Sequence, residues 1–360
     1  MAEKTEDFMT TLDVGIQRPH VVNRDRLFDD VIKLYKTKFL EIFKQYPFSI
    51  AYQNEKAHDT GGVRRDMFSQ FWDETWLKCF DGGSILIPAV NPHTDTALFP
   101  VLGTILSHGF LVSNFLPLRI AFPSLAAMLL GPTILIPDSI LVDTFADYLS
   151  TYESVFIHEI LVLLKDQQPQ VFTNEQTKTL VDILSRMDCR EIPNPTNLRR
   201  LIVQVAKHEF LTKPLGALYA FNSGVPAIHH PFWNEVTIGE LYSWYKALNA
   251  TPKRVIEKLV ENEDMSAAES RVFKFLVTFI GDLNPEELRN FLRYVTGSSV
   301  LICERIKVTF NGVSGLGRSP VGHTCDCWLE LSTTYYTYPE FKHEFLNILN
   351  SAVAWPMDAV

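Results

Sequence analysis

The amino-acid sequence predicts a folded α+β protein that is mostly helical over its first 260 residues. Hydrophobic residues make up 46% and aromatic residues 12% of the 360 residues, a composition typical of globular chains and not of disordered ones. Apolar residues recur every three or four positions in many segments, as on one face of a helix, whereas two segments near the carboxyl end alternate polar and apolar residues, as in a half-buried strand. A chain of this length can form two or three units, each with its own core.

The first eighty residues predict a tail, two helices and a short strand. Residues 1–24 are polar and lack periodicity, so we expect a tail or the end of a linker. A helix should follow over about residues 25–45, with its apolar residues on one face. A strand is expected at residues 48–52, and a second helix over residues 65–79 after the glycine turn at residues 60–62. The buried faces of the two helices should consist of Phe28, Ile32, Tyr35, Phe39, Phe43, Phe68, Phe71, Trp72 and Trp76.

Residues 99–154 predict two or three helices in the core. Arg119 is the only charged residue within residues 96–137, but polar residues and prolines interrupt this stretch. No apolar run reaches the roughly 20 residues that a membrane-spanning helix requires, so we expect buried helices and no membrane span. Further along the chain, the pattern predicts an amphipathic helix over residues 198–211 and a loop at residues 221–226.

The last hundred residues predict a small α+β unit. Residues 261–267 are polar and small, which makes them the best candidate for a linker. A helix should begin at Asn284, with Pro285 at its first position, and end at Gly297. The remaining predicted elements are strands at residues 305–310 and 327–331, a glycine-rich loop at 311–322 between them, and a final helix from a capping box at 337–340.

The charge and the cysteines restrict the class of function. The net charge of -9 comes from acidic residues scattered along the chain. Nucleic acids and anionic membranes bind concentrated basic surfaces, so neither partner is expected. The odd number of cysteines and the polar amino terminus indicate a reducing compartment, the cytoplasm or the nucleus, and not a disulfide framework. The five cysteines are Cys79, Cys189, Cys303, Cys325 and Cys327.

Cys325 is the candidate nucleophile. A nucleophilic thiol must be accessible to a large partner while its backbone is held in place, and a loop that leads into a strand offers both. His323 could favour the reactive thiolate, whereas the negative charge of Asp326 acts against it. Two other interpretations stay open: Cys325 could be a small buried hydrophobic residue, and His323, Cys325 and Cys327 could bind a metal ion.

Other familiar catalytic motifs are absent from the sequence. His158 and His208 each precede a glutamate but lack the second histidine of a zinc-binding HExxH helix. The pair His229 and His230 has no nearby ligand partner, so we expect it to lie in a loop. No P-loop, GxSxG or dinucleotide fingerprint occurs. We therefore expect neither a cofactor nor a metal.

Four segments together resemble the HECT-type ubiquitin ligase domain. His323-Thr-Cys325, about 35 residues from the carboxyl end, is similar to the cysteine loop of that family. Residues 291–297 (FLRYVTG) resemble its LxFVTG helix end, and residues 59–68 (DTGGVRRDMF) resemble its DxGGxxREFF turn and helix. Residues 99–109 stand where a FxxxGxxxGxAL helix is expected. In this order and spacing the resemblance extends over about residues 25–355.

The resemblance implies a bilobal fold. A mostly helical amino-terminal lobe, residues 25–260, would be joined by a hinge at residues 261–267 to a smaller α+β catalytic lobe, residues 268–360. Residues 160–245 would form a subdomain that docks a ubiquitin-conjugating enzyme. The candidate docking residues are Phe210, Leu218, Tyr219 and Phe221. Packing in the core would explain the same apolar side chains equally well.

The resemblance also implies a ubiquitin-protein ligase. Cys325 would accept ubiquitin from a conjugating enzyme as a thioester and transfer it to a lysine of a protein substrate, without a cofactor. His323 and Thr324 would shape the loop, and Met357 would be an apolar anchor where the family favours Phe. Asp326 departs from the aromatic or apolar residue usual in the family. This departure favours an alternative, a catalytically weak module that binds a conjugating enzyme or ubiquitin without transfer; an unrelated helical protein is a third interpretation.

Overall fold

The computed structural model describes residues 1–10, 18–38, 42–43, 48–56, 58–164, 171–261 and 264–351. Helices dominate these residues and three small sheets accompany them, which confirms the α+β class. The chain divides into two compact units: Met1–Asp73, His108–Leu116 and Trp244–Val360 form the first, and Glu74–Ser107 and Pro117–Ser243 form the second. The amino-terminal residues and the carboxyl-terminal third thus belong to one unit.

The amino-terminal part of the first unit consists of short helices and a parallel strand pair. Its elements are α1 (Ala2–Thr10), β1 (His20–Val22), a 3₁₀ turn (Arg24–Arg26), α2 (Leu27–Thr37), β2 (Ile50–Tyr52) and the first part of α4 (Gly62–Cys79). β1 pairs in parallel with β2, with His20 opposite Ile50. The prediction of a tail over residues 1–24 was wrong, because Met9 is buried and Oγ1 of Thr5 donates a hydrogen bond to Oδ1 of Asn114.

The predicted apolar faces of the first helices are buried. Phe39 lies outside the described residues, and the other predicted positions are at most 7% exposed. Phe28 stacks on Phe71, with ring centroids 5.6 Å apart, which joins α2 to α4. Periodicity alone therefore identified the buried side of both helices.

The second unit is almost entirely helical. Its elements are the last part of α4, the hairpin β3 (Phe80–Gly82) and β4 (Leu86–Pro88), a 3₁₀ turn (Thr96–Leu98), α5 (Phe99–Ser113) as far as Ser107, α6 (Phe122–Leu130), α7 (Asp138–Tyr148), α8 (Thr151–Leu163), α9 (Asn174–Ser185), α10 (Leu198–Lys207), a π-helical turn (His208–Thr212), α11 (Leu215–Ser223), a 3₁₀ turn (Ala227–His229), α12 (His230–Asn234) and the first part of α13 (Ile238–Leu248). The predicted core helices of residues 99–154 are α5, α6 and α7. Phe221 belongs to α11 and not to the predicted loop, which begins at Gly224.

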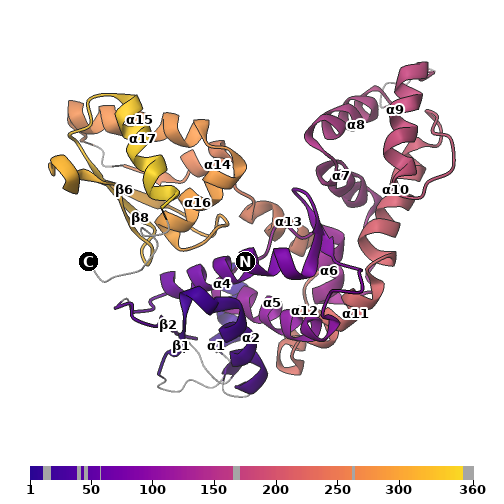
Figure 1. The fold of residues 1–360 in the computed structure, drawn as a ribbon, viewed down its shortest axis with the longest axis horizontal. Coiled ribbons are helices and arrows are strands. Elements are labelled where there is room, and N and C mark those ends of the chain that lie inside the picture. Colours follow the sequence, from indigo (N-terminus) through magenta and orange to yellow (C-terminus); the bar gives the residue numbers. More distant parts are fainter. Residues whose placement is uncertain are drawn as a thin grey trace. The chain divides into compact units, whose positions relative to one another are not determined.

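The carboxyl-terminal part of the first unit contains the four-stranded sheet. Its elements are α14 (Pro252–Ile256), β5 (Leu259–Val260), α15 (Ala267–Asp282), α16 (Pro285–Thr296), β6 (Ile306–Asn311), a 3₁₀ turn (Gly315–Arg318), β7 (Val321–His323), β8 (Trp328–Ser332) and α17 (Tyr338–Leu349). The strand order is β5-β6-β8-β7, and β7 is antiparallel to β8 while the other pairs are parallel. Figure 1 draws this part in orange and yellow, with β6 beside β8.

One hydrophobic core holds this carboxyl-terminal part together. Its buried members begin at Val255 and end at Leu349, and Leu259 of β5 packs against them. The predicted hinge at residues 261–267 therefore connects two elements, β5 and α15, that contribute to the same core. The core begins near residue 250, about eighteen residues before the predicted lobe boundary.

The ends of α16 and the start of α17 can be compared with the capping residues that the sequence predicted. Asn284 accepts hydrogen bonds from the backbone of Glu286 and Glu287, and Gly297 ends α16 with φ 76°, as predicted. The predicted capping box of the last helix does not form, because the side chain of Thr337 makes no capping hydrogen bond. The helix does have a proline, Pro339, at its start, where proline is favoured.

One stretch among the described residues is long and apolar enough to cross a membrane. It extends from Thr96 to Ser113, and 72% of it is buried inside the protein.

Candidate active site

Cys325 lies in the turn that joins two antiparallel strands. His323 of β7 is opposite Trp328 of β8, so residues 324–327 form the connection between them. The thiol of Cys325 is free and the residue is half-buried. The structure thus places the cysteine where the sequence predicted it, at the point where a loop leads into a strand.

Gly62 packs directly against the cysteine turn. A Cβ atom at Gly62 would lie 2.5 Å from Oγ1 of Thr324 and 3.0 Å from the backbone nitrogen of Cys325. The carbonyl oxygen of Gly62 would in turn lie 2.5 Å from a Cβ atom at Gly297. These approaches leave no room for a side chain at either glycine, so the two glycines bring α4, the end of α16 and the cysteine turn together.

Arg65 joins the same three segments through hydrogen bonds. Its Nε donates to the carbonyl oxygen of Thr296 at 2.9 Å, and its Nη2 donates to the carbonyl oxygens of Thr324, at 2.5 Å, and Cys325, at 3.3 Å. Burial and the adjacent charge of Arg64 lower the pKa of Arg65, yet an arginine stays protonated in proteins. A positive charge and two hydrogen-bond donors therefore hold the backbone of the cysteine turn.

A buried carboxylate, Asp66, occupies the position of α4 next to Arg65. Asp66 is 1% exposed and accepts hydrogen bonds from Arg24 and Arg293, each at 2.6 Å, and from the hydroxyl of Tyr52 at 2.9 Å. Burial opposes ionisation of this carboxyl, but the two arginines outweigh it, so the pKa of Asp66 is lowered. The ion pair between Asp66 and Arg293 joins α4 to α16. Asp66 is the residue that follows Arg65, so this ion pair lies next to the contacts of Arg65 with the cysteine turn.

The side chain of His323 lies against β8. Its ring stacks on Trp328 with centroids 4.2 Å apart, and its Nε2 is 3.7 Å from Oε2 of Glu330. Asn311 donates to the other oxygen of Glu330 at 3.0 Å. Nε2 is buried and makes no hydrogen bond within the described part of the chain. His323 is thus held in one orientation, two residues before the thiol.

Two cysteines of the same region are bonded to each other. The structure joins Cys303 to Cys327 with Cα atoms 6.7 Å apart, within the range of protein disulfides. The sequence led us to expect reduced cysteines and not a disulfide framework, and this one bond differs from that expectation. Cys327 is the last residue of the turn, with φ 51°, and its sulfur is not a free metal ligand in this state. The remaining free thiols of the described chain are those of Cys79, Cys189 and Cys325.

Three of the four candidate docking residues belong to the core of the second unit. Phe210, Leu218 and Phe221 have no exposed surface, and Phe221 stacks on Phe99 with centroids 5.0 Å apart. The core interpretation therefore holds for them, and they present nothing to a partner in this structure. Tyr219 is 52% exposed and keeps docking as a predicted role. The predicted anchor Met357 lies outside the described residues.

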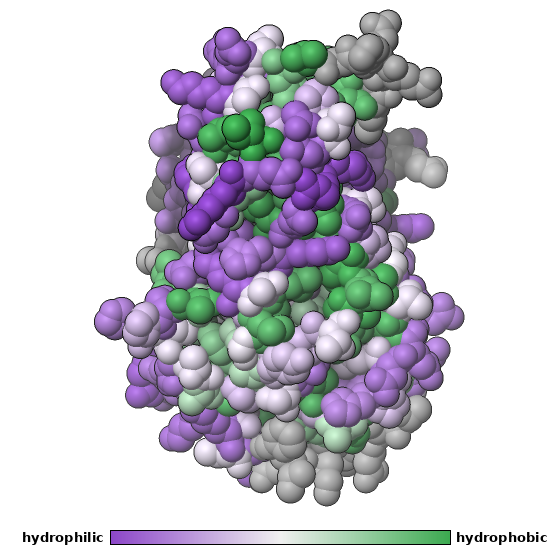
Figure 2. Space-filling view, turned by 90° about the vertical axis from the view of Figure 1, so that its right-hand side faces the viewer, coloured by the Kyte–Doolittle hydropathy of each residue, from purple (hydrophilic) through white to green (hydrophobic). Residues whose placement is uncertain are grey.

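The surface of the second unit carries further apolar side chains. Leu215 and Tyr219 are four positions apart on α11 and are both exposed, so they share one face of the helix. On α8, Tyr152, Val155 and Val162 are exposed as well. Figure 2 shows hydrophobic residues interspersed with hydrophilic ones on the face that it draws.

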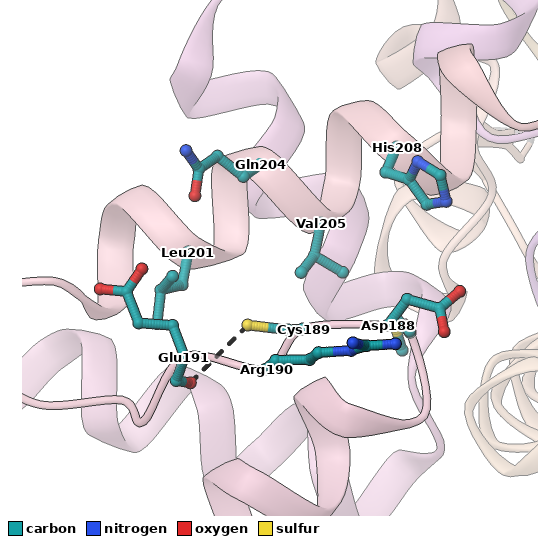
Figure 3. A pocket seen from close by; sticks show the side chains of 9 residues that line it. Asp188, Cys189, Arg190, Glu191, Leu201, Gln204, Val205 and His208 are labelled. Atoms are coloured by element: carbon teal, nitrogen blue, oxygen red, sulfur yellow. Dashed lines mark hydrogen bonds between the residues drawn. The ribbon is translucent and has the colours of Figure 1, made fainter.

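A pocket of about 360 Å³ lies in the second unit between α10 and the segment before it. Figure 3 shows its lining, which consists of Met187, Asp188, Cys189, Arg190, Glu191, Leu201, Gln204, Val205 and His208. The sulfur of Cys189 faces the carbonyl oxygen of Glu191, at 3.8 Å. The pocket belongs to the subdomain predicted to dock a partner, whereas Cys325 belongs to the first unit.

The fold and the site define an α+β protein with a free, half-buried thiol in a turn that is held by a glycine contact and an arginine. A scan of the sequence against known protein families finds no match, and a comparison with curated proteins finds no similar one. Sequence reasoning singled out Cys325, His323 and Thr324 but gave no role to Arg65. The available signal was its position three residues after the double glycine.

Proposed function

We propose that this chain is a HECT-like ubiquitin-protein ligase that accepts ubiquitin as a thioester on Cys325. The observation that carries the proposal is the meeting of three segments that resemble that family. Residues 59–68, residues 291–297 and the cysteine turn contact one another through Gly62, Arg65 and Gly297. Segments more than 200 residues apart in sequence thus converge on a free thiol.

The first step transfers ubiquitin from the conjugating enzyme to Cys325. The Cys325 thiolate attacks the carbonyl carbon of the thioester that links ubiquitin to the conjugating enzyme. A carbon–sulfur bond to Cys325 forms, the bond to the enzyme's sulfur breaks, and that sulfur leaves as a thiolate. One thioester replaces another, so no cofactor is needed and positioning supplies most of the rate.

The second step transfers ubiquitin to a protein substrate. A neutral lysine amine attacks the Cys325 thioester, a carbon–nitrogen bond forms and Cys325 leaves as a thiolate. The proton of the resulting ammonium passes to water. His323 and Thr324 shape the turn in this scheme, through the stacking of His323 on Trp328 and the contact of Thr324 with Gly62.

The proposal includes a bilobal arrangement with the hinge moved toward the amino terminus. Because β5 packs in the carboxyl-terminal core, residues 261–267 are a poor place for a hinge between lobes. We place the hinge at residues 249–251, between α13 and α14. Arg254 donates hydrogen bonds to the carbonyl oxygens of Lys246, Ala247 and Asn249. These bonds fix the backbone conformation of the connection in this structure. Docking of the conjugating enzyme is assigned to the exposed face of α11 that bears Tyr219.

The test is a charging assay with Cys325→Ala and Cys325→Ser beside the unchanged chain. Each protein is incubated with ubiquitin-activating enzyme, a panel of conjugating enzymes, ubiquitin and ATP, and run on gels with and without a thiol reductant. We expect an adduct on the unchanged chain that reductant removes. The alanine variant should form none, and the serine variant should form one that resists reductant, because an oxygen ester replaces the thioester.

Cys189→Ala is the matched control, because it removes a half-buried free cysteine of the second unit. An adduct that persists in Cys325→Ala, or that is lost in Cys189→Ala instead, contradicts the assignment. No adduct with any charged conjugating enzyme would favour the alternative of a binding module without transfer.

A further inference from the structure

We infer that Arg65 is a positioning residue for the Cys325 thiol, and that its guanidinium holds the turn in the geometry that reacts. The inference rests on the proposed function, because the thiol that Arg65 positions is the nucleophile of that function. Arg65 comes from α4 and the turn joins β7 to β8, so the contact spans 259 positions of the chain. Its side chain donates hydrogen bonds to the carbonyl oxygens of both Thr324 and Cys325.

The hydrogen-bond pattern explains why an arginine stands here. Nη2 reaches the two successive carbonyl oxygens of Thr324 and Cys325, while Nε of the same planar group is fixed on Thr296. The bond to Thr296 fixes the plane of the guanidinium, and the plane then determines where the turn carbonyls lie. A lysine has its donors on one nitrogen at the end of a flexible stem, so it lacks the second nitrogen in a rigid plane that bonds Thr296.

A close contact with Gly62, also of α4, leaves little freedom to the backbone of the turn. Gly62 lies against Thr324 and the backbone nitrogen of Cys325, so the turn cannot move toward α4. The hydrogen bonds of Arg65 prevent it from moving away. Tyr294 of α16 holds the preceding strand, because its hydroxyl donates to the carbonyl oxygen of Pro320 at 2.7 Å. The thiol is thus presented on a backbone that is restrained both from approaching α4 and from moving away from it, and a fixed geometry favours rapid acyl transfer.

The first experiment measures the thiol without any ubiquitin. The unchanged chain, Arg65→Ala, Arg65→Lys and Arg64→Ala are treated with limiting iodoacetamide, and alkylation of each cysteine peptide is followed by mass spectrometry. Arg64 is the matched control, because it is the adjacent arginine of α4 and donates to the carbonyl oxygen of Phe48 and not to the turn. Cys79 is fully buried and reports global unfolding within the same sample.

Loss of the guanidinium should release the turn and expose the thiol. We expect alkylation of Cys325 to accelerate several-fold in Arg65→Ala and Arg65→Lys, while Cys79 stays protected and Arg64→Ala behaves as the unchanged chain. An unchanged rate at Cys325 in Arg65→Ala overturns the inference. Acceleration at Cys79 to the same degree as at Cys325 also overturns it, because Arg65 would then serve general stability.

The second experiment measures single-turnover loading of Cys325 against the concentration of charged conjugating enzyme. Misplacement of a reacting group by about 1 Å can cost about a hundredfold in rate. We expect the maximal rate to fall by about that factor in Arg65→Ala and to be recovered only in small part by lysine. The half-saturating concentration should not change, because the predicted docking face lies on α11. A raised half-saturating concentration with an unchanged maximal rate overturns the positioning role.

The two experiments separate this inference from the proposed function. If the unchanged chain forms no adduct, the ligase proposal fails, and the alkylation rates alone decide whether Arg65 holds the turn. Gly62→Ala provides an independent displacement of the turn that leaves the guanidinium intact. It should accelerate alkylation of Cys325 as Arg65→Ala does, and an unchanged rate would contradict the two-sided fixation of the turn.

Discussion

Two sites, one in each unit, bury their polar groups in opposite ways. In the first unit Asp66 is buried as a charged carboxylate between the two cations Arg24 and Arg293. In the second unit His229 is buried as a neutral ring, 2.8 Å from the hydroxyl oxygen of Ser107, which also accepts a hydrogen bond from Trp233 at 2.7 Å. One site depends on the presence of charge and the other on its absence.

The difference follows from what each site connects. Asp66 and its partners join the amino-terminal segment, α4 and α16, which are distant in sequence and surround the contacts of the cysteine turn. A buried charge pair is costly unless all its members are present, so it specifies one arrangement of these segments. In the second unit helices approach closely through small residues. A Cβ atom at Gly103 would lie 1.8 Å from the carbonyl oxygen of Phe221, so backbone contact and not charge fixes α5 against α11.

Removal of the buried carboxylate should be the most damaging of three changes that probe this contrast. Asp66→Ala leaves Arg24 and Arg293 without their central partner, and breaking a buried ion pair in this way costs about 3–5 kcal/mol. Urea unfolding monitored by fluorescence measures the free energy. Asp73→Ala is the matched control, because Asp73 also faces Arg293, at 3.7 Å, but is 53% exposed. It should cost less than about 1 kcal/mol, and equal losses in the two variants would show that burial of Asp66 is not what matters.

The next change tests the close approach in the second unit. Gly103→Ala places a methyl group against the backbone of Phe221, where no flexible side chain can move aside. We expect a loss of about 3 kcal/mol, the upper part of the range for overpacked cores. The control is Gly216→Ala on α11, where an added Cβ meets nothing within 4 Å. This variant should be stabilised by about 0.5–1 kcal/mol, since alanine favours a helix interior. Equal destabilisation by the two variants would show that the close approach of Gly103 to Phe221 is not the cause, because an alanine at Gly216 meets nothing within 4 Å.

The contrast also explains which features the sequence could predict. Local patterns identified the buried faces of α2 and α4, the caps of α16 and the position of Cys325 before a strand. They failed for residues 1–24, because α1 and β1 are held by partners that local periodicity does not reveal. They failed for Phe210 and Phe221 because an aromatic residue on a helix has the same pattern whether its face meets the core or a partner. The bond of Arg65 to the turn joins residues 259 positions apart, and nothing local encodes such a pairing.

The smallest effect distinguishes the two sites by pH. Burial, together with the nearby charge of His230, lowers the pKa of His229 to about 3, whereas an unfolded histidine has a pKa of about 6.5. Between these values the unfolded chain binds a proton that the folded chain does not. The contribution of His229 is therefore complete above pH 6.5 and is lost as pH falls toward 3. The carboxylate of Asp66 has a lowered pKa, so its contribution is lost only as pH falls below the ordinary value of 3.8.

Unfolding free energies at pH 7 and pH 5 should therefore differ through His229 and not through Asp66. One pKa unit corresponds to about 1.4 kcal/mol, so the unchanged chain should lose about 2 kcal/mol between these pH values from this residue. His229→Gln keeps a polar side chain that does not titrate, and it should lose about that much less over the same interval. Asp66→Asn should keep the full loss between pH 7 and pH 5. If His229→Gln loses as much stability as the unchanged chain, the buried ring accepts its proton without unfolding, and the neutral character assigned to the His229 site is wrong.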